Sequence, residues 1–68
     1  MGLNVRAARE ALGWSQEDLA HESGYHRTYV SGVERGVRNP TVTVIAGLAE
    51  TLGTTPGALL DRAPKRKP

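Results

Sequence analysis

The residues with the clearest chemical potential lie between Gly24 and Pro40, in the stretch GYHRTYVSGVERGVRNP. Two valines three residues apart, Val30 and Val33, mark one face of a short helix. The side chains around them are polar and either short or planar. Guanidinium groups can pair with guanine edges, and small hydroxyls can bond other base edges. The stretch is therefore either a basic surface loop or a helix shaped for a nucleic-acid groove.

Other kinds of chemistry find little support in the 68 residues, which are enough for one domain. The absence of cysteine excludes disulfides, thiolate metal sites and cysteine nucleophiles. The two histidines, His21 and His26, have no carboxylate at ligand spacing, so we expect no metal site. The chain has no nucleophile–base pair and no Gly-rich phosphate loop. We expect a protein that is not an enzyme and uses neither a cofactor nor a small-molecule ligand.

Charge and hydropathy point to a cytoplasmic protein without a membrane partner. The best apolar run, VTVIAGLA, is far below membrane-spanning length, and the charged start MGLNVRAARE does not continue into the apolar segment of a signal peptide. The net charge of +2 is too small to indicate a polyanion partner. Its distribution says more, because an acidic segment containing Glu17 and Asp18 precedes a basic one with Arg27, Arg35 and Arg38.

Periodicity and capping residues predict five short helices and no strand. The first runs from Asn4 to Leu12, with Asn4 as N-cap and Gly13 in the left-handed position after its end. The second covers residues 16–23. Ser15 caps it, Asp18 approximates a capping box, and Trp14 and Leu19 occupy the hydrophobic-staple positions.

The third helix is expected over residues 27–35, with His26 as N-cap and Gly36 after its end. Only about two residues separate it from the second helix, which suits two helices that cross steeply as a helix-turn-helix. Thr41 caps a fourth helix over residues 42–52, and Pro56 opens a short fifth one through Leu60. The fold class is all-α, a compact bundle of five short helices over residues 1–61, and residues 62–68 are expected to form a disordered basic tail.

The blocks GWSQEDLA, SGYHRTYVSGVERGVRNPT and LAETLG, in this order and at these separations, resemble the helix-turn-helix domain of phage repressor and Cro-type regulators, the XRE family. The resemblance extends from Val5 to about Leu60. It implies a lambda-repressor-like fold and a sequence-specific transcriptional regulator of double-stranded DNA, such as a small controller protein. It also implies a homodimer on an inverted-repeat operator, with the third helix in the major groove, and hence an association with the nucleoid.

The resemblance also assigns site residues. Arg27 and Thr28, at the start of the third helix, are expected to reach base edges. The other candidate DNA contacts, mostly to phosphates, are Gln16, His26, Tyr29, Ser31, Arg35, Arg38 and Asn39; Tyr29 could equally rest on the second helix. Gly32 stands where the family commonly has a base-reading side chain, so specificity would depend on Arg27, Thr28 and DNA shape. A glycine inside a helix also suggests a close approach or mere tolerance.

Two charges lie on the apolar stripes of their helices. The resemblance places Arg9 opposite Glu34 as a partly buried ion pair, and the alternative is two separately solvated charges. Leu59, Leu60 and the outer side of the fourth helix are candidates for the dimer surface. The rival function is an antitoxin-like module whose main surface covers a protein and whose DNA binding is secondary.

Overall fold

Five α-helices and no strand make up the part of the chain that the structure, a computed structural model, describes, residues 1–61. The helices are α1 (Gly2–Ala11), α2 (Gln16–Ser23), α3 (Arg27–Arg35), α4 (Val42–Leu52) and α5 (Pro56–Leu60). The expected all-α fold is thereby confirmed, with four helix starts as the capping signals predicted. The expected basic tail, residues 62–68, lies outside the described residues. No helix within residues 1–61 is long and apolar enough to cross a membrane.

The start of α1 differs from the expectation. Asn4 does not cap the helix, because α1 already begins at Gly2 with Met1 as N-cap. The Asn4 side chain instead donates hydrogen bonds to the carbonyl oxygens of Leu59 (3.0 Å) and Asp61 (2.5 Å), which ties α1 to the end of α5. Capping and tertiary bonding are both open to a short amide side chain. Here the Asn4 amide bonds the end of α5, and Asn4 itself lies within the first turn of α1.

Local side-chain hydrogen bonds account for the starts of α2, α4 and α5. Ser15 Oγ accepts from the Asp18 N–H (3.0 Å) and Asp18 Oδ2 from the Ser15 N–H (2.8 Å), so the capping box is complete despite the shorter aspartate. Thr41 and Thr55 cap α4 and α5 with their hydroxyl oxygens. These bonds satisfy backbone donors that a helix start leaves unpaired.

The core draws on every helix. Its buried apolar residues are Val5, Leu19, Ala20, Val30, Val33, Ile45, Leu48, Ala49, Leu52 and Leu59. Trp14 is partly buried and packs against this cluster. One expectation was wrong: Leu59, proposed for the dimer surface, is only 1% exposed. Leu59 is buried because α5 folds back against α1 and α4.

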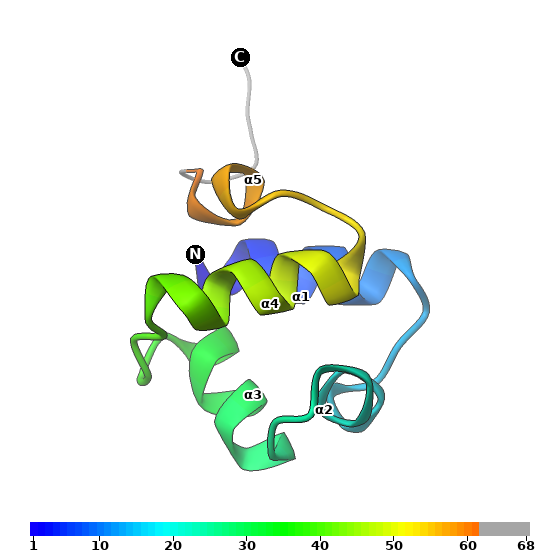
Figure 1. Cartoon of the computed structure of the whole chain (residues 1–68). Helices are drawn as coiled ribbons and strands as arrows, with labels where there is room; N and C mark the ends of the chain where they lie inside the picture. The colour runs from blue at the N-terminus through cyan, green and yellow to red at the C-terminus, as the bar shows by residue number, and fades with distance from the viewer. Residues whose placement is uncertain (62–68) are drawn as a thin grey trace.

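The arrangement in space presents α3 at one end of the molecule (Figure 1). In this view α2 is seen nearly along its axis while α3 runs across it, so the two helices cross steeply. The inner side of α3 packs on α1 and α2. The helix α5 lies at the opposite end, beyond α4 and α1. Helix α3 is thus packed against the bundle on one side and exposed to solvent on the other.

Candidate nucleic-acid interface

The exposed side of α3 begins at its N-terminus. Arg27 and Thr28, the first two residues of the helix, are both exposed, and so is the N-cap residue His26. Within the described residues the His26 side chain accepts no cap hydrogen bond, so the first backbone N–H groups of α3 remain open to an external acceptor. This end therefore offers a guanidinium, a hydroxyl and backbone donors together.

Tyr29 and Ser31 are half-buried on α3. The Tyr29 ring packs against Tyr25, with ring centroids 5.6 Å apart and planes inclined by 47°. Both rings also lie against the core. Tyr25 belongs to the turn between α2 and α3, so the aromatic pair fastens the start of α3 to that turn. A tilted pair of this kind stabilises by about 0.5–1.5 kcal/mol beyond its buried area.

The inner side of α3 carries an ion pair with α1. Arg9 Nε donates to Glu34 Oε2 (2.7 Å) and a terminal nitrogen of Arg9 to Glu34 Oε1 (3.1 Å), and both residues are less than 10% exposed. The other terminal nitrogen donates to the Trp14 carbonyl oxygen (2.6 Å). The hydrogen bond to Glu34 raises the pKa of Arg9 above its ordinary value. This network joins α1, α3 and the segment before α2.

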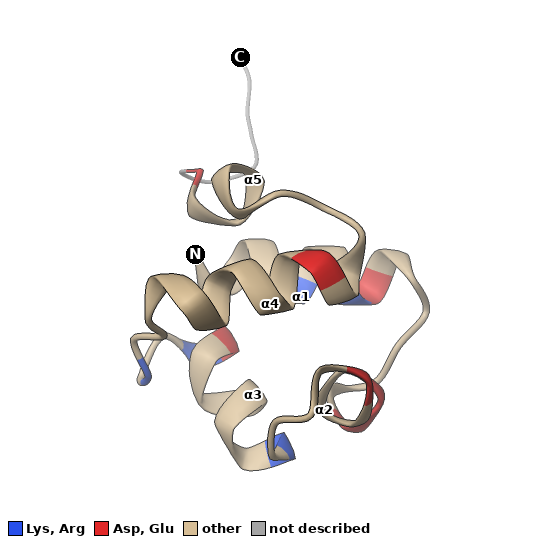
Figure 2. Cartoon of the chain, in the orientation of Figure 1, with Lys and Arg blue, Asp and Glu red and all other residues tan. Residues whose placement is uncertain are grey.

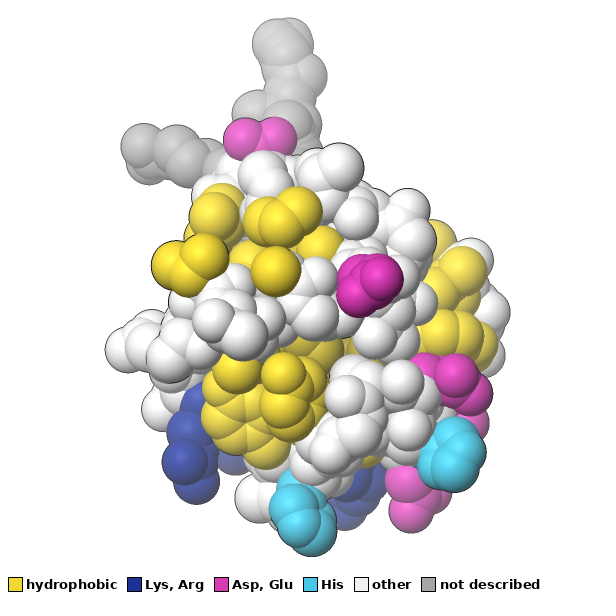
Figure 3. Space-filling view, viewed as in Figure 1, with side chains coloured by type: hydrophobic (Ala, Val, Ile, Leu, Met, Phe, Trp, Pro, Cys, Tyr) yellow, Lys and Arg dark blue, Asp and Glu magenta, His cyan; other side chains and the backbone are white. Residues whose placement is uncertain are grey.

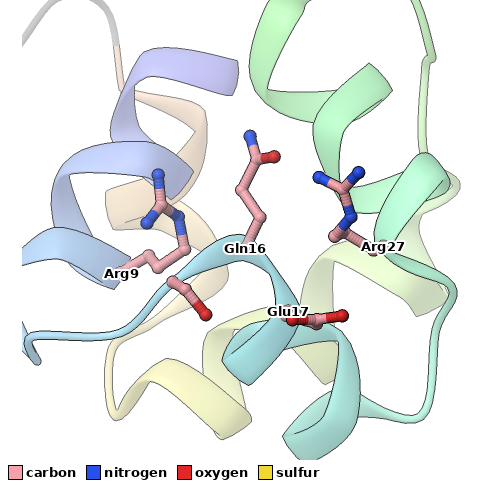
Figure 4. A pocket seen from close by; sticks show the side chains of 5 residues that line it. Arg9, Gln16, Glu17 and Arg27 are labelled. Atoms are coloured by element: carbon pink, nitrogen blue, oxygen red, sulfur yellow. The ribbon is translucent and has the colours of Figure 1, made fainter.

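Gln16, the expected phosphate clamp, belongs to the same network. Its amide nitrogen donates to Glu34 Oε1 (3.1 Å). Gln16 also lines an open pocket of about 520 Å³ together with Arg9, Ser15, Glu17 and Arg27 (Figure 4). Residues at the start of α2 and at the start of α3 therefore line the same pocket. Because an amide nitrogen carries two hydrogens, Gln16 keeps a second donor beside its bond to Glu34.

The end of α3 and the loop after it carry the remaining polar candidates. Arg35, Arg38 and Asn39 are exposed. Lys and Arg colouring appears at the start of α3 and in the loop after it, both on the half of the molecule away from α5 (Figure 2). The loop turns back because Gly36 adopts a left-handed conformation with φ 80°, which places the next residues beside the last turn of α3. The structure thus separates the candidates into a group at each end of α3.

Sequence reasoning missed how Gly32 is surrounded. A Cβ built on Gly32 would lie 2.5 Å from Arg38 Cγ and 3.5 Å from Val37 Cγ2. Gly32 is buried, so a side chain there would meet the following loop and not a groove. The glycine's unusual place inside a helix was the available signal, but only the folded loop shows which atoms occupy the space.

An exposed helix that follows a tight turn, is anchored by its inner face and carries basic and hydroxyl groups at its N-terminus defines a helix-turn-helix protein of the DNA-binding class. The comparison with known families agrees: the model of the helix-turn-helix family HTH_3 matches residues 5–59. The chain belongs to this family. Its relatives are transcriptional regulators and not enzymes.

Small controller proteins are among the similar chains. The control protein C.SmaI of Serratia marcescens is 48% identical over 59 residues, which are 87% of this chain and 70% of that protein. The crystal structure of the restriction-modification controller protein C.AhdI from Aeromonas hydrophila matches with a TM-score of 0.83 at 47% identity, covering 87% of this chain and 89% of that one.

A third similar structure includes DNA. The biofilm regulator SinR in complex with DNA matches with a TM-score of 0.83 at 28% identity, over 88% of this chain and 97% of that one. The chain therefore has the fold of proteins that control transcription from DNA, over nearly the whole of its described length.

Proposed function

We propose that this chain is a sequence-specific transcriptional regulator that binds double-stranded DNA with α3 in the major groove. The observation that carries the proposal is the placement of Arg27 and Thr28. Both are exposed on the first turn of a helix whose inner face is anchored by Val30, Val33 and the Glu34 ion pair. Side chains at that end of a recognition helix reach base edges, and an arginine can bond guanine O6 and N7 together.

The phosphate contacts flank this helix. On one side lies the start of α2, where unpaired backbone N–H groups and the second amide hydrogen of Gln16 suit a phosphate oxygen. On the other side, Arg38 and Asn39 are exposed on the loop. We propose that His26, Tyr29, Ser31 and Arg35 also contact the phosphates of the DNA backbone. Such contacts position the protein, whereas base contacts specify the sequence.

The proposal includes a homodimer. Val42 on α4 and Leu60 on α5 are 79% and 55% exposed, and hydrophobic side chains gather over the α4–α5 end of the molecule (Figure 3). Exposed apolar patches commonly mark interaction sites. An inverted repeat requires the two copies of α3 to lie on the same face of the dimer, about 34–36 Å apart, so that both enter the major groove of one duplex. Leu60 takes the place of Leu59 in this surface.

We infer the cellular role of this chain from the controller proteins that it resembles. C.AhdI is a restriction-modification controller, and we extend that kind of regulation to this chain, acting in the cytoplasm on nucleoid DNA. The antitoxin-like alternative predicts instead a tight complex with a protein made from a neighbouring gene and only secondary DNA binding.

The test begins with selection of a binding site from random duplex DNA, followed by titrations of wild type, Arg27→Ala and Arg38→Ala on the selected and a scrambled duplex. Arg27→Ala should cost about 1–3 kcal/mol on the selected site and relax the base choice at one position of each half-site. Arg38→Ala should weaken both duplexes equally.

The wild-type log–log salt slope should be roughly −6 to −9 for a dimer, since each phosphate contact releases counterions. A chain that shifts no duplex at low salt contradicts the proposal. Equal losses on both duplexes for Arg27→Ala would make Arg27 a phosphate contact and remove it from base recognition.

A further inference from the structure

The helical conformation of Gly32 does not itself require glycine. Within residues 1–61 the residues with positive φ are Gly13, Gly24, Gly36 and Gly53, so Gly32 has an ordinary helical backbone that any residue could adopt. Glycine in a helix interior is unfavourable by about 1 kcal/mol relative to alanine. Some other feature of the structure must therefore account for the missing side chain.

The way α3 ends does not require glycine either. The N–H of Gly36 bonds the Val33 carbonyl (3.1 Å) and the N–H of Val37 bonds the Gly32 carbonyl (2.9 Å), which is a Schellman motif with Gly32 at its first acceptor. The same bonds end α1 and α4, where Arg9 and Ala49 hold the corresponding position. Both of those residues carry side chains, so the motif tolerates them.

What distinguishes α3 is the next residue of the loop. The Arg38 N–H makes an additional bond to the Gly32 carbonyl (3.2 Å). It brings the Arg38 stem over the glycine, with Cγ 2.5 Å and Cβ 3.6 Å from the place where a Cβ of residue 32 would be. A contact of 2.5 Å between carbon atoms is not possible. The space vacated by the side chain of Gly32 is occupied by the Arg38 stem.

We propose that Gly32 is a positioning residue, whose missing side chain seats the Arg38 stem and thereby directs its guanidinium to a DNA phosphate. The clash is with Cγ, which moves only if χ1 of Arg38 rotates or the loop shifts, and either change redirects every atom beyond it. A β-carbon at residue 32 thus changes where the guanidinium points without touching the DNA. This inference rests on the proposed function, since Arg38 must contact the DNA backbone.

The test compares Gly32→Ala with Gly47→Ala, a glycine inside α4 whose added Cβ would make only an ordinary 3.5 Å contact with the Tyr25 hydroxyl. Gly47→Ala should melt no lower than wild type, because alanine favours the helix. Gly32→Ala should gain less stability than Gly47→Ala, because the Arg38 stem must move. Only Gly32→Ala should weaken DNA binding, by the same factor as Arg38→Ala and equally on selected and scrambled duplexes. Its salt slope should be shallower by about 1 per subunit. The Hα–Hβ coupling constants of Arg38 should show a changed χ1 rotamer.

The double variant Gly32→Ala with Arg38→Ala completes the test. It should bind like Arg38→Ala alone, because the space beside Gly32 no longer affects DNA binding once the guanidinium is removed. Should Gly32→Ala unfold, the double variant should fold again, since an alanine side chain in place of Arg38 has no Cγ. A double variant that stays unfolded overturns the inference.

Three other results overturn the positioning role: wild-type affinity and slope for Gly32→Ala, an equal loss for Gly47→Ala, or no change of slope for Arg38→Ala. Failure of the proposed function has a separate signature, because the wild-type chain would then shift no duplex at low salt. That result would remove the positioning role as well.

Discussion

Replacing Arg9 by alanine should destabilise the fold far more than replacing Arg6, although both arginines lie on α1 and both are ion-paired. The Arg6 pair with Glu10 is exposed, with side-chain exposures of 58% and 54%, whereas the Arg9 pair with Glu34 is buried, at 9% and 3%. Loss of Arg9 leaves the Glu34 carboxylate inside the molecule with one remaining donor, Gln16.

The magnitude follows from that burial. Removing one partner of a buried pair costs about 3–5 kcal/mol, because the other charge stays buried and uncompensated. An exposed helical pair contributes only about 0.3–0.5 kcal/mol. A domain of this size has a total stability on the order of 3–9 kcal/mol, and each kcal/mol shifts the melting temperature by about 4–8 °C. Arg9→Ala should therefore melt about 12–40 °C lower than wild type, and Arg6→Ala only a few degrees lower.

The assay is thermal and urea unfolding followed by circular dichroism, with both variants and a double variant, Arg9→Met with Glu34→Leu. The double variant should recover most of the stability, since apolar side chains of similar size replace buried ion pairs with little loss. If Arg9→Ala melts within a few degrees of Arg6→Ala, the buried pair does not stabilise the fold and the reasoning is refuted.

Three further outcomes concern separate parts of the fold. An added Cβ at Gly2 would lie 2.5 Å from the Val33 carbonyl oxygen, so Gly2→Ala should cost about 1–3 kcal/mol in urea unfolding; an equal cost for Gly57→Ala, which has nothing nearer than 4.0 Å, would contradict this. Hydrogen bonds from the Ser15 backbone and hydroxyl lower the pKa of Asp18 below 3.8. Its contribution is present above the unfolded-state pKa and is lost as the pH falls through the lower folded pKa, so the melting-temperature gap between wild type and Asp18→Asn should narrow as the pH falls below 3.8; a constant gap would contradict it. Leu60→Lys should shift the chain toward monomer in sedimentation without lowering its stability, and an unchanged dimer would exclude the α5 surface.

Much of the fold could be predicted because its signals are local. Ser15 and Asp18 cap α2 from within three residues of each other, and Gly36 and Gly53 end their helices through their own backbone conformation. Such signals act between neighbours in the chain, so they can be seen without knowing the fold. The start of α3, and with it the exposed Arg27, follows from the short turn after Gly24, although the His26 side chain makes no cap hydrogen bond.

The tertiary structure alone decided the features that depend on distant partners. Asn4 bonds the end of α5 and does not cap α1, because Leu59 and Asp61 come within reach only after folding. Gln16 donates to Glu34, 18 residues away. Gly32 is covered by Arg38, although the two are only six residues apart, because the loop after Gly36 turns back over α3. Residue types and spacing determine which bonds are possible, but several partners compete for each polar group, and packing decides between them.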